Sequence, residues 1–156
     1  MALMKTKKTH TGGCQCGALR FRVEEPLQPG EICHCRMCQK AFGNFGALLV
    51  SVDLARFAWT RGTPSTFRSS ALVERGFCQN CGTPLFIQDD GGTILDLAIG
   101  AFDHPEVVTV VEQIGIESRL PAFAELAHLP ERKTSDTRTK AEMEKLKSLQ
   151  HPDYET

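Results

Sequence analysis

Seven cysteines are the residues of this chain with the clearest capacity for chemistry. They fall into three groups with none left over: Cys14-Gln-Cys16, Cys33-His-Cys35-Arg-Met-Cys38 and Cys78-Gln-Asn-Cys81. An odd number excludes a complete set of intramolecular disulfides. Clustered cysteines in a reducing compartment more often bind metal. The grouping therefore favours metal binding over disulfide or redox use.

The first and last groups are pairs whose sulfur atoms converge. In an extended strand, residues i and i+2 lie on the same side, so Cys14 and Cys16 can face one point. The step from Cys78 to Cys81, followed by Gly82, is typical of a tight knuckle. If the two pairs share one metal, these four cysteines close it, as four protein ligands close a structural zinc site.

The middle group would then hold a second metal through Cys33, Cys35 and Cys38. Strand geometry places Cys33 and Cys35 on one side and turns His34 away from them. Zinc suits thiolate ligands, whereas this spacing is not a common one for iron–sulfur clusters. A three-ligand zinc keeps its fourth position for water or substrate. Because thiolates weaken the Lewis acid, capture of an incoming thiol suits this site better than activation of water.

Several segments together resemble one known family, from about Gly12 to Leu129. They are Thr11-Gly-Gly-Cys-Gln-Cys-Gly17, Cys33-His-Cys35-Arg-Met-Cys38-Gln-Lys40, Phe67-Arg-Ser-Ser70, Arg75-Gly-Phe-Cys78-Gln-Asn-Cys-Gly-Thr-Pro-Leu85 and Gly100-Ala-Phe-Asp-His-Pro105. In this ordered pattern the chain resembles the glutathione-dependent formaldehyde-activating enzyme family, which also includes centromere protein V.

The resemblance implies a β-tent fold with two zinc ions per chain. It places the structural zinc on Cys14, Cys16, Cys78 and Cys81, and the catalytic zinc on Cys33, Cys35 and Cys38. It also implies the reaction of glutathione with formaldehyde to give S-(hydroxymethyl)glutathione. This reaction forms a carbon–sulfur bond, and its enzyme is classed as a carbon-sulfur lyase.

Two other functions remain open at this point. One is a non-catalytic zinc-built module that binds glutathione or a protein, and thiol binding without any change in the rate of adduct formation would favour it. The other is a zinc-built interaction domain without a small-molecule site. Arg36, Gln39 and Lys40 adjoin the middle group and are either partners for the carboxylates of a peptide-like thiol or solvated loop residues.

The elements that must position these cysteines are mainly β. Leu19, Phe21 and Val23 alternate with polar residues, a period of two that indicates a half-buried strand. The run Asp89-Asp90-Gly91-Gly92 predicts a hairpin turn. No long helical period appears before residue 118, so we expect several short antiparallel strands there. A capping box at Thr139-Lys-Ala-Glu142 predicts a short C-terminal helical segment, which is either docked or frayed.

We therefore predict three parts: a mobile N-terminal tail over residues 1–10, a zinc-binding domain over 11–130, and a polar, possibly helical extension over 131–156. The chain has 156 residues, 41% of them hydrophobic, which suits one globular domain. A net charge of −1 argues against nucleic-acid partners and a polybasic membrane surface. No apolar stretch predicts a membrane span or an export signal, so we expect a cytoplasmic protein.

Overall fold

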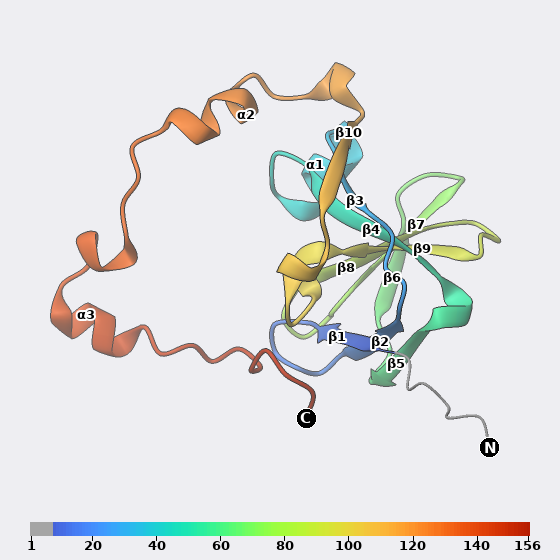
Figure 1. The fold of residues 1–156 in the computed structure, drawn as a ribbon, viewed down its shortest axis with the longest axis horizontal. Helices are drawn as coiled ribbons and strands as arrows, with labels where there is room; N and C mark the ends of the chain where they lie inside the picture. Colours follow the sequence, from blue (N-terminus) through green and yellow to red (C-terminus); the bar gives the residue numbers. More distant parts are fainter. Residues whose placement is uncertain (1–7) are drawn as a thin grey trace.

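The computed structural model describes residues 8–156, which fold mainly as β-sheet (Figure 1). Ten strands of this described part form two sheets. The smaller sheet has the spatial order β1 (Thr9–Gly13), β2 (Arg20–Glu24) and β5 (Phe57–Arg61). The larger has the order β10 (Val110–Ile114), β3 (Gly30–Cys33), β4 (Ala47–Asp53), β9 (Ile94–Ala98), β8 (Pro84–Asp89), β7 (Val73–Phe77) and β6 (Ser65–Arg68). Neighbouring strands are antiparallel except β10 and β3. The predicted mainly β body is confirmed.

The strand predicted around Phe21 and Val23 is β2. Both side chains are buried, as their alternation with polar residues requires. The ring of Phe21 packs against Phe57 and Trp59 of β5 and against Phe102, with centroid separations of 5.3–6.1 Å. Because Phe102 follows β9 of the larger sheet, this aromatic cluster joins the two sheets in one core.

The turn predicted over residues 89–92 connects β8 to β9. The Gly92 N–H donates to the carbonyl of Asp89 at 2.9 Å, and Gly91 has a φ of 68°, a conformation that glycine adopts without a Cβ clash. Beyond the turn, Leu95 and Leu97 are buried in β9. The hairpin prediction is confirmed.

A short helix that the sequence did not predict, α1 (Arg36–Phe42), begins directly after Cys35 and includes Cys38. Cys35 is the residue before the helix, and its Sγ accepts the Cys38 N–H at 3.4 Å. The helix ends at Gly43, whose φ is 59°. Seven residues make only two turns, which is too short for a helical period to show in the sequence.

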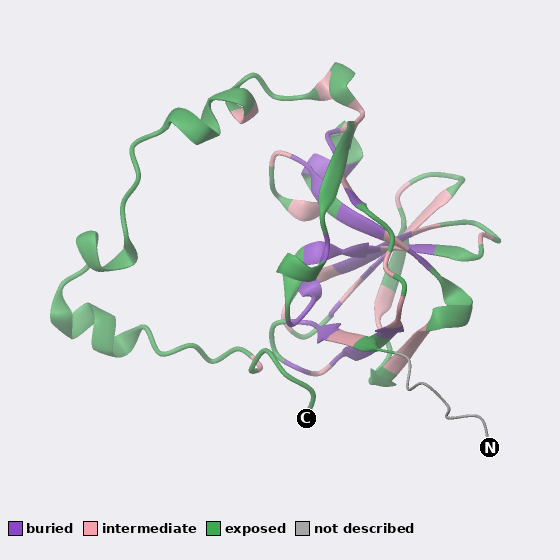
Figure 2. Cartoon of the chain, in the orientation of Figure 1, coloured by how far each residue is buried: buried purple, intermediate pink, exposed green. Residues whose placement is uncertain are grey.

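The C-terminal region leaves the body as an extended arc (Figure 1). It contains α2 (Ala122–Glu125) and α3 (Lys140–Lys145). The predicted capping box is present, since the Thr139 N–H donates to a Glu142 carboxylate oxygen at 2.8 Å and the Glu142 N–H donates to Thr139 Oγ1 at 3.3 Å. Residues 130–149, hereafter the C-terminal arm, are all exposed (Figure 2). The helix therefore forms, but it is not docked.

Both ends of the described chain contact the body. Residues 1–7 of the predicted N-terminal tail lie outside the described residues. Thr9 and His10 belong to β1, because they pair with β2, and His10 Nε2 lies 2.9 Å from Glu25 Oε1. At the other end the His151 N–H donates to the Gln15 carbonyl at 2.7 Å. No helix within residues 8–156 is long and apolar enough to cross a membrane.

Candidate metal centres

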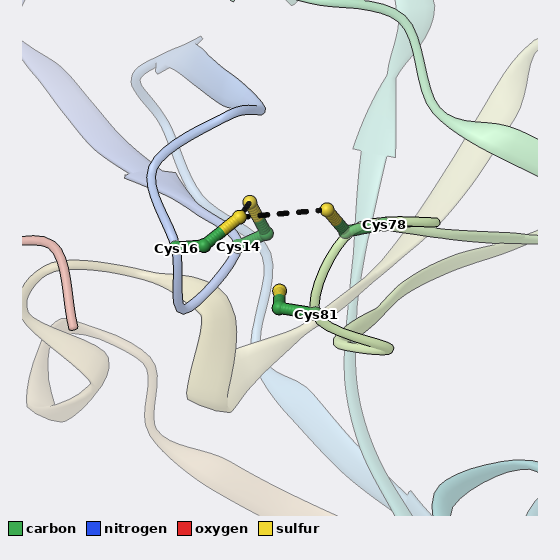
Figure 3. Close-up of side chains that lie close together, drawn as sticks. All are labelled: Cys14, Cys16, Cys78 and Cys81. Carbon is green, nitrogen blue, oxygen red and sulfur yellow. Dashed lines mark hydrogen bonds between the residues drawn. The ribbon is translucent and has the colours of Figure 1, made fainter. Parts of the chain in front are cut away.

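Four cysteines from two distant segments converge on one point (Figure 3). Cys14 and Cys16 lie in the loop after β1, and Cys78 and Cys81 lie in the turn between β7 and β8. Their four Sγ atoms lie within 4.8 Å of one another. We call this set the four-cysteine cluster.

Glycines shape both loops that carry these cysteines. The Gly17 N–H donates to the Cys14 carbonyl at 3.0 Å, and the Gly82 N–H donates to the Cys78 carbonyl at 2.7 Å. Both glycines have positive φ, 74° and 78°, which residues with a Cβ rarely adopt. Each chain segment therefore turns back on itself and presents two sulfur atoms in the same direction.

The sulfur separations in the four-cysteine cluster match a tetrahedral metal site. Cys14 Sγ lies 3.6 Å from Cys16 Sγ, and Cys16 Sγ lies 3.8 Å from Cys78 Sγ. A tetrahedral zinc with Zn–S bonds of about 2.3 Å places its sulfurs about 3.8 Å apart. The donors are also of the soft type that zinc accepts, so the residues present fit this ion.

The thiols of this cluster differ in acidity. Burial raises the pKa of Cys14 to about 12, despite a hydrogen bond from the Leu19 N–H to its sulfur at 3.2 Å. Burial also opposes ionisation of Cys81, but hydrogen bonds from the side chain and backbone of Thr83 lower its pKa to about 6. A metal that binds here must displace the proton of Cys14, which makes its affinity dependent on pH.

The middle group forms a separate three-cysteine cluster. Cys33 ends β3, Cys35 precedes α1, and Cys38 lies in the first turn of that helix. Their Sγ atoms lie within 4.8 Å of one another, and these are soft donors that fit zinc. Within residues 8–156, these two clusters are the groups in which at least three potential metal ligands (His, Cys, Asp or Glu) lie close enough to share one ion.

A buried arginine contacts the three-cysteine cluster. Arg75 of β7 is 4% exposed, and its two terminal guanidinium nitrogens lie 3.7 and 3.8 Å from Cys38 Sγ. Its Nε donates to Ser69 Oγ at 2.9 Å. Burial raises the pKa of Cys38 to about 12, with Arg75 acting in the opposite direction. The sequence motif contains Arg75 but does not reveal its contact with Cys38. The one available signal of a functional role was a charged residue three positions before Cys78.

The polar residues beside this cluster divide into supporting and exposed groups. His34 is turned away from the cysteines as expected, and it is fully buried, with Nε2 3.0 Å from Gln113 Oε1. Gln39 is also buried, and its Nε2 donates to the carbonyls of His34 and Ser118. Gln39 is therefore neither a solvated loop residue nor a free partner for a carboxylate, because its buried amide joins α1 to the chain after β10.

Two neighbouring cavities adjoin Arg75. The first, which we call the cationic cavity, has a volume of about 410 Å³ and includes Arg36, Lys40 and Arg75 in its wall. The second, the aromatic cavity, has a volume of about 250 Å³, and its wall includes Phe67 and Phe77. Ala41, Phe67 and Arg75 line both cavities, so the two spaces meet at these side chains. Sequence reasoning missed Phe67 and Phe77, which come together through pairing of β6 with β7.

Comparison with known proteins supports both the pattern and the fold. A family model described as "Glutathione-dependent formaldehyde-activating enzyme" matches residues 9–117. A curated Halomonas elongata protein, named "Putative glutathione-dependent formaldehyde-activating enzyme", is 34% identical over 87 residues, which are 50% of this chain and 55% of that protein. The match thus spans about half the length of that relative. A crystal structure of a Rhodobacter sphaeroides protein shares the fold, with a TM-score of 0.55 and 20% identity over 66% of this chain and 98% of the other.

Proposed function

The chain belongs to the glutathione-dependent formaldehyde-activating enzyme family, and from that premise we propose that it joins a glutathione-like thiol to a small aldehyde such as formaldehyde. The observation that carries the proposal is a three-cysteine cluster with a cationic cavity beside it. Three thiolates leave the fourth position of a tetrahedral zinc free. Positive side chains beside that position suit a thiol that carries carboxylates, as glutathione does.

We assign one zinc ion to each cluster, and so two to the chain. In the four-cysteine cluster, protein ligands would fill all four coordination positions of the ion, which suits a structural role. The three-cysteine cluster of Cys33, Cys35 and Cys38 would hold the reactive ion. When bound, that ion would supply the Lewis acid that keeps an incoming thiol deprotonated near neutral pH.

The chain's own residues would bind and orient the thiol. Arg36 and Lys40 are exposed on α1 and line the cationic cavity, so each can reach a carboxylate there. Arg36 Nη1 also donates to Gln39 Oε1 at 2.9 Å, one turn along the helix. Two cations one helical turn apart match the two carboxylates of glutathione.

The reaction is an addition that requires no oxidant or reductant. The thiol releases its proton to solvent, and a sulfur electron pair forms the bond to the carbonyl carbon. The π electrons of the C=O bond move onto oxygen, and the resulting alkoxide takes a proton from water. Arg75, in contact with Cys38, is the buried donor that would stabilise the negative charge on that oxygen.

Exchange spectroscopy by NMR tests this proposal. The exchange of formaldehyde and glutathione with their hydroxymethyl adduct is measured with wild-type protein, with Cys38→Ser and without protein. We expect wild type alone to accelerate exchange, because Cys38→Ser keeps the scaffold and loses the three-thiolate set. Since the uncatalysed addition is fast, the protein-free rate is the essential control.

Equal rates in all three samples would refute the enzymatic proposal. Glutathione binding that saturates without accelerating exchange would then identify the protein as a non-catalytic thiol-binding module. Acceleration by Cys38→Ser as strong as that of wild type would place the chemistry elsewhere in the molecule.

A further inference from the structure

Building on the proposed function, we infer that the aldehyde carries an apolar tail of several carbons, and that this tail binds in the aromatic cavity beside the three-cysteine cluster. The inference concerns the second substrate, whereas the cationic cavity serves the thiol. It depends on the shape and chemistry of the wall, on the position of Arg75 and on the volume available.

The wall of the aromatic cavity is built from α1, β6, β7 and β8. Ala41 and Phe42 come from α1, Phe67 from β6 and Phe77 from β7. The rings of Phe67 and Phe77 pack with centroids 6.1 Å apart. Phe67 remains 46% exposed, so a large apolar side chain faces solvent at this site when the cavity is empty. An apolar ligand would cover surface that is otherwise in contact with water.

Glycine at position 76 is required for this wall. A Cβ at Gly76 would lie 1.9 Å from the ring of Phe86, which also lines the cavity. Gly76 and Phe86 are directly paired between β7 and β8. The absent side chain lets the Phe86 ring lie across the strand, so this part of the wall is continuous and apolar.

Charge distinguishes the two cavities. The cationic cavity is lined by Arg36, Lys40 and Arg75 and by no acidic side chain, which suits an anion. The aromatic cavity has Arg75 as its one charged lining residue, and that guanidinium is already bound to Ser69 and Cys38. Because that guanidinium is directed at the three-cysteine cluster and the other lining residues carry no charge, the occupant of the aromatic cavity is neutral and apolar.

The position of Arg75 connects this cavity to the reacting atoms. Its guanidinium contacts Cys38 Sγ, and the same residue lines both cavities. An aldehyde with its carbonyl beside the three-cysteine cluster could therefore extend its carbon chain past Arg75 into the aromatic cavity. The thiol would keep its carboxylates on the other side, near Arg36 and Lys40.

The volume is larger than formaldehyde needs. The aromatic cavity measures about 250 Å³, whereas a water molecule takes about 30 Å³ in the liquid, so about eight groups of that size fit. Formaldehyde has two non-hydrogen atoms and hexanal has seven. An aldehyde of about the size of hexanal fills this space, and formaldehyde leaves most of it empty.

Binding of two thioethers tests the inference on the full-length, zinc-loaded protein. S-methylglutathione and S-hexylglutathione carry the carbon skeletons of the formaldehyde and hexanal adducts, and calorimetry measures their affinities. We expect the hexyl compound to bind at least about tenfold more tightly, which requires burial of only two of its five additional methylene groups. Ala41→Leu, which fills the cavity, should bring the two affinities to within about twofold.

Two further variants separate the cavity from general effects. Leu72→Ala removes an apolar side chain that is 56% exposed and does not line either cavity, so it should keep the full preference for the hexyl compound. Phe67→Ala removes one wall of the cavity from an exposed strand and should reduce the preference at least about threefold. It provides an independent result if Ala41→Leu folds poorly.

Equal affinities in wild type, binding of neither compound, or an undiminished preference in both Ala41→Leu and Phe67→Ala would overturn the inference. The formaldehyde exchange experiment is read separately. Acceleration of formaldehyde exchange without a hexyl preference keeps the proposed function and refutes the apolar substrate. A hexyl preference without acceleration of any exchange keeps the cavity as an apolar binding site and refutes the catalytic role.

Discussion

At the scale of single residues, Arg75 and Cys38 behave as one unit. A guanidinium cannot lose its charge in a protein, so an arginine that is 4% exposed needs a nearby anion. Cys38 Sγ is within contact distance, and three thiolates with one Zn²⁺ carry one net negative charge. Arg75 would neutralise that charge and leave the site able to accept a further thiolate.

We therefore expect Arg75→Met to weaken both zinc retention by the three-cysteine cluster and glutathione binding. Loss of a hydrogen bond to a charged group corresponds to about 1.5–3 kcal/mol, or about a ten- to hundredfold change in affinity. Zinc transfer to a colorimetric chelator measures the first effect and calorimetry the second. Arg68→Met is the matched control, because Arg68 pairs with Asp90 at an exposed site. Equal behaviour of the two variants would exclude the role of Arg75.

The two clusters should also respond differently to loss of one cysteine. Cys16 and Cys78 are 62 positions apart, so their shared ion would cross-link distant segments, whereas the three-cysteine cluster lies within one short segment. A structural zinc contributes about 10–16 kcal/mol in zinc-finger peptides, comparable with the whole stability of a domain, about 5–15 kcal/mol. We expect Cys78→Ser to unfold and Cys35→Ser to lose one zinc but stay folded. Calorimetric melting curves that coincide would contradict this division.

At the scale of elements, the structure shows which features a sequence pattern can predict. Strand alternation around Phe21 and the turn at residues 89–92 were predictable because each depends on neighbours in the chain. The helix α1 was not, because its seven residues are too few for a helical period and its start is a cysteine rather than a usual capping residue.

The candidate site divides in the same way. The grouping of the cysteines is a local pattern, and the structure brings the same residues together. Arg75 contacts the three-cysteine cluster, and Phe67 lines the cavities beside Arg75, only because β6 pairs with β7, with Phe67 opposite Arg75, and α1 lies beside that hairpin. Their place depends on tertiary contacts, which spacing along the chain does not contain.

One ion pair connects the two sheets and has a measurable effect on stability. Arg20 of β2 donates to Asp103, which follows β9, at 2.8 Å, and both side chains are almost fully buried. Burial opposes ionisation of Asp103, but hydrogen bonds from Arg20 and Thr11 hold its pKa below the ordinary value of 3.8. A lowered pKa in the folded state stabilises the protein above pH 3.8, and this contribution is lost as the pH falls through the folded-state pKa.

We expect Asp103→Ala to lower the free energy of unfolding at pH 7 by about 3–5 kcal/mol, since it leaves a buried guanidinium without its main partner. Chemical denaturation measures the change. Asp90→Ala, which breaks an exposed pair with Arg68, should cost less than about 1 kcal/mol. Similar losses in the two variants would mean that the buried pair contributes no more than a surface one.

At the scale of the whole molecule, the chain separates into a packed body and an exposed extension (Figure 2). The two sheets, the core and both clusters lie before residue 115, and the C-terminal arm buries no side chain. Beyond the arm, Arg20 Nη2 donates to the Tyr154 carbonyl at 3.3 Å. We propose that residues 11–130 form the zinc-binding domain and that residues 131–156 are an extension whose last few residues contact that domain.

Limited proteolysis tests this division. We expect trypsin to cut first between residues 130 and 149, where every lysine and arginine is exposed, and to leave a fragment that retains both metal ions. Mass spectrometry under native and denaturing conditions identifies the fragment and its metal content. A first cut within residues 11–117, or loss of metal when the arm is removed, would contradict the proposed boundary.

The central claim is that each of the two cysteine clusters binds one metal ion, and that the first ion has no free coordination position while the second can accept a thiol. NMR of the protein loaded with ¹¹³Cd in place of zinc, during titration with glutathione, tests it most directly. We expect two resonances of equal intensity. Glutathione leaves the first unchanged, and it moves the chemical shift of the second toward that of the first as a fourth sulfur binds the ion. In Cys38→Ser the shifting resonance should be lost or altered while the other remains. A single resonance, or two that both ignore saturating glutathione, would contradict the account.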